Sequence, residues 1–92
     1  MEWNKEIEDL YTQITDLTPQ AFRPSVKPML REASEKTARL RNSGFVSRDD
    51  LLSALFEITP DAFQPTVVAD LKSIGIDTDR YIKLSEIRQK FA

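Results

Sequence analysis

The sequence predicts an all-α protein, a single compact domain of five to six helices over residues 1–92. Three observations predict this class. Apolar residues recur at spacings of three and four, whereas the alternation of a strand is missing over any four residues or more. Prolines and only two glycines divide the periodic segments. With 40% apolar residues, the chain has enough material for one core.

The first predicted helix runs from about Asn4 to Asp16. Apolar and aromatic residues recur along it at helical spacing: Trp3, Ile7, Leu10, Tyr11 and Ile14. After it, Thr18 and Pro19 are typical of a helix start, because threonine can cap the helix and proline lacks only an N–H that would be unpaired there. We therefore expect a short turn to begin at Pro19.

Ser25 is expected to cap a second, basic helix that runs to about Arg41. Pro24 should end the short turn before it, and Pro28 falls early enough in the helix to be tolerated. One face of this helix is expected to be buried: Val26, Leu30, Ala33, Thr37 and Leu40. Gly44 suits the left-handed position that follows a helix.

Ser47 and Asp50 have the spacing of a capping box, which predicts a helix over 48–57 with its apolar residues mostly inward. A further helix is expected to end at Gly75. The remaining residues predict a loop around 77–80 and a last helix with apolar residues at Leu84, Ile87 and Phe91.

A ten-residue phrase occurs twice, as "LTPQAFRPSV" at 17–26 and as "ITPDAFQPTV" at 58–67. We interpret each copy as a helix-entry device in which threonine caps a turn, the second proline breaks it and the next hydroxyl residue caps the main helix. This interpretation places Phe22 and Phe63 in the core. It predicts an internal helix-loop-helix repeat with halves at about 17–57 and 58–92.

Composition excludes several kinds of chemistry. The chain has no cysteine and no histidine, so thiolate nucleophiles, disulfides, zinc sites and histidine-dependent triads are excluded. The adjacent Asp49 and Asp50 lie at a predicted helix start, where carboxylates stabilise the helix dipole. We therefore expect no enzymatic activity. No apolar run could span a bilayer and the N-terminus is acidic, so a cytoplasmic location is expected.

Charge is unevenly distributed along the chain. Residues 23–48 carry seven Lys or Arg against two acids, a net charge of +5, whereas the whole chain has a net charge of −2. Such a band is either a solvated helix face or a partner-binding face. If the band is a partner-binding face, the candidate protein-binding residues are Arg23, Lys27 and Arg31. Nucleic-acid binding is not expected, and we expect a monomer or weak self-association.

Two twelve-residue segments, 39–50 and 75–86, resemble a degenerate pair of EF-hand loops. Calcium needs oxygen ligands at alternating places and a final bidentate carboxylate, and the second segment offers these as Asp77, Asp79 and Glu86. Both segments depart from the pattern at the first place, where Arg39 and Gly75 stand. The resemblance implies an interaction module with at most one weak calcium site, and most simply with no metal or other cofactor.

Residues 26–54, together with Trp3, resemble a small helical domain that lies at the C-terminus of light-independent protochlorophyllide reductase and also occurs as short free-standing proteins. The matching features are a tryptophan opening an acidic helix, a basic helix with Glu35 near its end, and a glycine-containing link to Val46 and Ser47. Residues 58–92 have no counterpart there. The resemblance implies an accessory domain rather than a catalyst.

The function we expect is therefore that of a non-catalytic helical accessory domain that binds a protein partner. The resemblance to the reductase domain implies a link to a tetrapyrrole-reductase-like system. The alternative is a degenerate EF-hand-like module.

Overall fold

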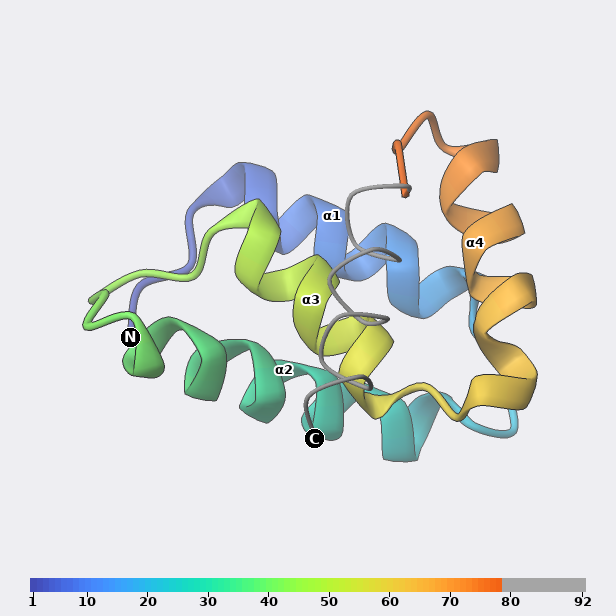
Figure 1. The fold of residues 1–92 in the computed structure, drawn as a ribbon, viewed down its shortest axis with the longest axis horizontal. Helices are drawn as coiled ribbons and strands as arrows, with labels where there is room; N and C mark the ends of the chain where they lie inside the picture. Colours follow the sequence, from blue (N-terminus) through green and yellow to red (C-terminus); the bar gives the residue numbers. More distant parts are fainter. Residues whose placement is uncertain (79–92) are drawn as a thin grey trace.

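The computed structural model describes residues 1–78, and these form an all-α fold, as predicted (Figure 1). The described part contains four α-helices and one short 3-10 helix: α1 Lys5–Leu17, α2 Arg23–Leu40, α3 Arg48–Ile58, η1 Asp61–Phe63 and α4 Gln64–Ser73. The predicted last helix, with Leu84, Ile87 and Phe91, lies outside the described residues, and so does part of the second predicted half, 58–92. No helix within residues 1–78 has the length and apolar character needed to cross a membrane.

Helix α1 begins where the sequence predicts. The Asn4 side chain accepts a hydrogen bond from the backbone N–H of Ile7 at 2.9 Å, which satisfies one of the free donors of the first turn. Ile7 and Ile14 are buried, and Leu10 between them is half-buried. The periodic apolar face of α1 therefore faces the core.

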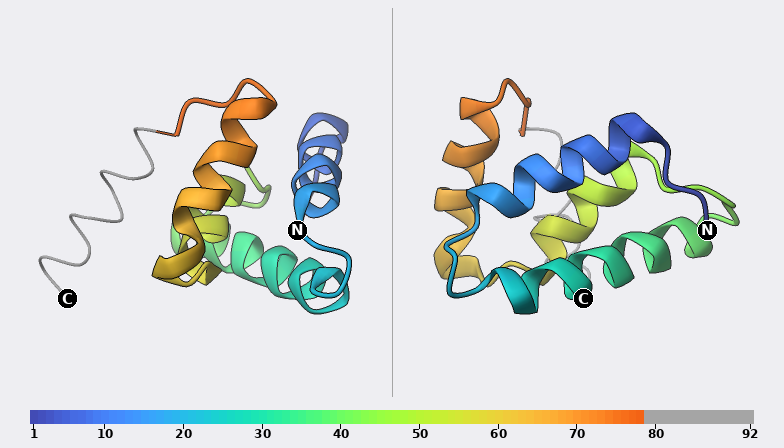
Figure 2. Two further views of the ribbon diagram at one scale, coloured as in Figure 1. Left: turned by 90° about the vertical axis from the view of Figure 1, so that its right-hand side faces the viewer. Right: turned by 180° about the vertical axis from the view of Figure 1, so that it is seen from behind.

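Helix α2 is the longest of the described helices, with 18 residues. It begins at Arg23 with Phe22 as its N-cap, so the prediction that Ser25 caps this helix is wrong. The physical reason is that Pro24 fits within the first turn, where its missing N–H would have no partner. In three views α2 lies along the lower edge of the molecule, below α1 and α3 (Figures 1 and 2).

The end of α2 also differs from the prediction. Asn42, with a φ of 59°, takes the left-handed position, and Gly44 does not have a positive φ. The N–H of Asn42 donates to the carbonyl of Arg39 at 2.9 Å, and that of Ser43 donates to Ala38 at 3.0 Å. This is the Schellman arrangement, in which the residue after the C-cap turns left-handed and asparagine can replace glycine.

Helix α3 packs against both α1 and α2, and its most extensive helix contact is with α2 (Figure 1). The predicted capping box is confirmed: Asp50 N–H donates to Ser47 Oγ at 3.2 Å, and Ser47 N–H donates to Asp50 Oδ2 at 2.9 Å. The prediction of inward apolar residues is also confirmed, since five of them are buried: Leu51, Leu52, Ala54, Leu55 and Phe56.

The two copies of the repeated phrase adopt the same local backbone. Phe22 has φ −101° and ψ −12°, and Phe63 has φ −102° and ψ −5°. Each phenylalanine N–H donates to the carbonyl of the proline three residues earlier at 2.9 Å. Eight residues after each phenylalanine a leucine is buried, Leu30 in α2 and Leu71 in α4. Both copies therefore start a helix in the same way.

Several details of the predicted helix-entry device are wrong. Phe22 and Phe63 are 60% and 61% exposed, so they do not share the core. Each phenylalanine is the N-cap residue of its helix. The residue that is buried in the core is instead the leucine two turns later, Leu30 or Leu71. The threonine of each copy does not cap a turn, because Thr18 Oγ1 donates to Ile14 O at 3.4 Å and Thr59 Oγ1 donates to Leu55 O at 2.6 Å.

Candidate protein-binding surface

Arg23 ties the start of α2 to the end of α1. Its Nε donates to the carbonyl of Thr18 at 2.9 Å, and its Nη2 donates to the carbonyl of Asp16 at 2.6 Å. These carbonyls lie at the C-terminal end of α1, which has no intrahelical donors and attracts positive charge. Arg23 therefore caps the C-terminal end of α1, and its charge is partly satisfied within the chain.

Arg31 lies in a cluster that joins α1 to α2, which we call the clasp: Trp3, Glu8, Tyr11, Arg31 and Glu35. The guanidinium pairs with both carboxylate oxygens of Glu8, at 2.9 and 3.3 Å. It also lies over the Trp3 ring, 4.3 Å from its centroid. The hydrogen bond to Glu8 raises the pKa of Arg31, while burial lowers it by less. Arg31 thus holds the two helices together.

The aromatic members of the clasp are also fixed by polar contacts. Trp3 Nε1 donates to Glu35 at 3.1 Å, and the Trp3 and Tyr11 rings meet edge to face at 5.5 Å. The Tyr11 hydroxyl donates to the Lys27 carbonyl at 2.6 Å. Burial raises the pKa of Tyr11, Arg31 lowers it, Glu8 raises it again, and the net shift is upward.

Lys27 is exposed and differs from the two arginines. Within residues 1–78 its ammonium makes no ion pair, and only its backbone carbonyl is used by the clasp. The structure therefore brings Arg23, Lys27 and Arg31 onto the first half of one helix. It gives structural contacts to both arginines and leaves the lysine charge at the surface.

An exposed apolar strip lies on α2 and was not predicted from the sequence. Phe22, Met29 and Leu40 are 60%, 51% and 78% exposed. The prediction that Leu40 is buried is wrong, because Leu30, Ser34 and Ala38 form the buried side of the helix instead. The signal was present in the sequence, since apolar residues occupy more of the α2 circumference than one buried side requires.

Arg41 and Asp50 close the loop between α2 and α3. Arg41 donates to both carboxylate oxygens of Asp50, at 2.6 and 2.8 Å, and Asp50 is only 2% exposed. Burial alone raises the pKa of this carboxyl, but the hydrogen bonds from Arg41 and Ser47 outweigh burial and hold the pKa below its usual value. The carboxylate at the last place of the first EF-hand-like segment, 39–50, is therefore paired with a guanidinium.

The second EF-hand-like segment is only partly described. Asp77 is exposed, whereas Asp79 and Glu86 lie outside the described residues. In the part of the chain that the structure describes, no three acidic side chains gather in a way that could hold a metal ion. The geometry of residues 1–78 therefore adds no support for a calcium site.

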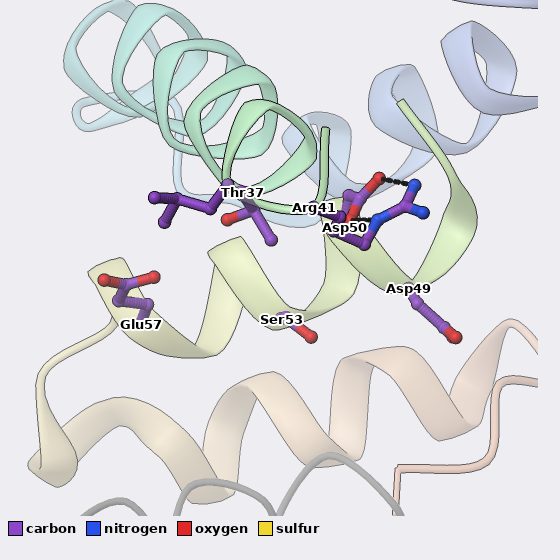
Figure 3. A pocket seen from close by; sticks show the side chains of 7 residues that line it. Thr37, Arg41, Asp49, Asp50, Ser53 and Glu57 are labelled. Atoms are coloured by element: carbon purple, nitrogen blue, oxygen red, sulfur yellow. Dashed lines mark hydrogen bonds and ion pairs between the residues drawn. The ribbon is translucent and has the colours of Figure 1, made fainter. Parts of the chain in front are cut away.

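A pocket of about 470 Å³ opens between α2 and α3 beside the Arg41–Asp50 pair (Figure 3). Its lining mixes hydroxyl, carboxylate and apolar groups: Thr37, Leu40, Arg41, Asp49, Asp50, Ser53 and Glu57. The two hydroxyls have no imidazole to activate them, because the chain contains no histidine. Leu40 connects the pocket to the exposed strip of α2.

Comparison with protein-family models, with curated proteins and with solved structures finds no match to this chain. The function of this domain is therefore inferred from the geometry of α2 and its neighbours.

Proposed function

We propose that this domain is a non-catalytic module that binds a protein partner through the outward surface of α2. The observation that carries the proposal is the exposure of Phe22, Met29 and Leu40, each more than half exposed on the same helix. Large apolar side chains that gather on a surface mark interaction sites more often than isolated ones do. Moving such a side chain fully out of water contributes about 1.5–3 kcal/mol.

The basic residues of α2 add a second component. Lys27 offers a surface charge without an ion-pair partner in residues 1–78, whereas Arg23 and Arg31 keep the helix in position. Charges at the rim of an interface mainly set the encounter rate and the choice of partner. We therefore assign affinity to the apolar residues and longer-range steering to Lys27, which lies on another side of α2.

The accessory role is supported by the resemblance of residues 26–54 and Trp3 to the reductase domain, and we place the domain in the cytoplasm beside a tetrapyrrole-reductase-like enzyme. The shared helix entries of 17–26 and 58–67 favour an internal repeat as its origin. Titration with a porphyrin tests for direct pigment binding. A change in the visible bands would make the pigment itself a ligand of the domain.

The proposal is tested by affinity purification from the native host. Wild-type protein is compared with a Phe22→Ser/Met29→Ser variant and with Gln13→Ser, which changes an exposed residue of α1. We expect a specific partner with the wild type and with Gln13→Ser, and at least a tenfold loss with the double variant, as two desolvated anchors imply. Equal recovery with the double variant would show that α2 is not the binding surface.

A further inference from the structure

The exposed strip of α2 has the spacing of a coiled-coil seam. Its positions follow one another at intervals of four, three, four, three and four residues, and we call them the seam: Phe22, Val26, Met29, Ala33, Lys36 and Leu40. Alternation of three and four keeps successive residues on one side of an α-helix and is the repeat by which two helices pack side by side. The buried residues of α2 lie on a different side of the helix.

The seam is accessible over its whole length. Phe22, Met29, Lys36 and Leu40 are exposed, and the small Val26 and Ala33 between them are half-buried. Figures 1 and 2 show α2 along one edge of the molecule, with α1 and α3 on its inner side. A second helix could therefore lie along α2 without displacing any described element.

Lys36 identifies the chemistry of the occupant. It lies in line between Ala33 and Leu40, and among residues 1–78 it has no ion pair, even with Glu32 one turn earlier. A lysine at a seam position loses water when the seam is covered, so it needs a carboxylate from the partner. The neighbouring Arg39 adds positive charge at the same end of the seam.

Two-fold pairing of the seam with a second copy of this chain would place no carboxylate directly opposite Lys36. In a parallel two-fold pairing Lys36 would face its own equivalent. In an antiparallel pairing centred on the seam it would face Val26, while Phe22 would face Leu40. Neither arrangement puts a carboxylate directly opposite the ammonium, so a second copy is the less favourable occupant.

We propose that the seam binds an amphipathic α-helix of a different protein, one that places an Asp or Glu opposite Lys36. This inference rests on the proposed function and names the class of partner. The apolar side of the incoming helix covers Phe22, Val26, Met29 and Leu40. The pocket beside Leu40 receives a side chain at the end of the contact. The single lysine fixes the register of the two helices.

The test uses two synthetic helical peptides of about three heptads, with leucine at the seam positions. One carries Glu at a single central seam position, and the other carries Lys there. Each is titrated into the full-length isotope-labelled protein, and amide shifts give both the contact surface and Kd. Wild type is compared with Lys36→Glu and with Lys5→Glu, a control charge reversal on an exposed residue of α1.

We expect shifts along α2 and a preference of about tenfold for the Glu peptide, which equals about 1.4 kcal/mol. Lys36→Glu should reverse the preference, and Lys5→Glu should leave it unchanged. Equal binding of both peptides, shifts confined to other elements, or no binding at millimolar peptide would each overturn the proposal. A dimer in sedimentation that Leu40→Glu dissociates would overturn it too, because a second copy would then cover the seam.

The two proposals fail in different ways. If affinity purification depends on Phe22 and Met29 but the peptides show no charge preference, the domain binds a partner and the acidic-helix class is wrong. If the peptides behave as expected and the purification is unaffected by the double variant, the seam accepts acidic helices but the proposed function is wrong.

Discussion

The carboxylate of Asp50 does three things at the residue scale. It accepts two hydrogen bonds from Arg41, it accepts the N–H of Ser47, and its position at the start of α3 stabilises the helix dipole. These contacts bind the ionised form, which is why the pKa is lowered although the group is buried. Asp50 therefore connects the closure of the α2–α3 loop to pH.

Replacing Asp50 with Asn should lower the free energy of unfolding by about 2 kcal/mol near neutral pH, because charge-assisted hydrogen bonds are lost. Since the folded pKa lies below 3.8, this contribution is present above that value and is lost as the pH falls through the lowered pKa. Urea unfolding at several pH values measures it. Asp9→Asn, an exposed control, should change little; a difference that persists in strong acid would contradict the assignment.

Tyr11 shows the opposite dependence on pH. Its pKa is raised above 10.0, so the stability from its protonated hydroxyl is present below that value and is lost as the pH rises through the raised pKa. Tyr11→Phe should cost about 1 kcal/mol near neutral pH, the usual contribution of one hydrogen bond. It should also remove a late tyrosinate step from the ultraviolet titration of the wild type. If the step that disappears lies at the ordinary pKa of tyrosine, Tyr11 ionises normally and the assignment is wrong.

The ends of the helices show, at the element scale, how far sequence patterns lead. Asn4, Ser47 with Asp50, and Gly75 are predicted to bound helices and do so, because caps act through neighbouring backbone groups only. The prediction for Gly44 fails because asparagine also tolerates the left-handed region, so Asn42 and Gly44 were both candidates for the same turn.

The two glycines provide a matched test of these assignments. Gly75→Ala should lower the free energy of unfolding by about 1 kcal/mol, because alanine is strained at a φ of +83°. Gly44→Ala should be nearly neutral, since Gly44 lacks a positive φ and a methyl group there meets no atom within 4 Å. Thermal unfolding of both variants measures the difference. A larger loss of stability for Gly44→Ala than for Gly75→Ala would mean that the left-handed residue after α2 is Gly44 and not Asn42.

The candidate surface was less predictable than the helices. Periodicity identified α2 and its basic residues, but it could not separate the buried side from the seam, because both are apolar and adjacent. Which side is covered depends on where α1 and α3 pack, and that is a property of the tertiary structure. The contacts that Arg23 and Arg31 make within the chain were not predictable for the same reason, because they also depend on how α1 and α2 pack.

The N-terminus closes the structure at the scale of the whole molecule. Glu2 N–H donates to the Gly44 carbonyl at 2.9 Å, and Val46 N–H donates to the Glu2 carbonyl at 2.9 Å. Trp3 then joins the clasp between α1 and α2. The first three residues therefore link the α2–α3 loop to both of the first two helices and keep α2 in place along the edge.

Trp3→Ala should destabilise the protein by about 2 kcal/mol, less than a fully buried tryptophan because Trp3 is half-buried. This corresponds to a fall in Tm of about 10 °C for a domain of this size. Trp3→Phe keeps a ring beneath Arg31 and loses only the hydrogen bond to Glu35, so its fall should be smaller. Equal effects of the two substitutions would show that ring stacking contributes nothing.

The most direct test of the central claim is site-specific photo-crosslinking in the native host. Benzoylphenylalanine is introduced at Met29, in the middle of the exposed surface of α2, and at Gln13 on α1 as the control. We predict a discrete crosslinked species with another protein from position 29, absent from position 13. Crosslinking from position 13 alone, or none from position 29 above the control, would contradict the assignment of α2 as the partner-binding surface.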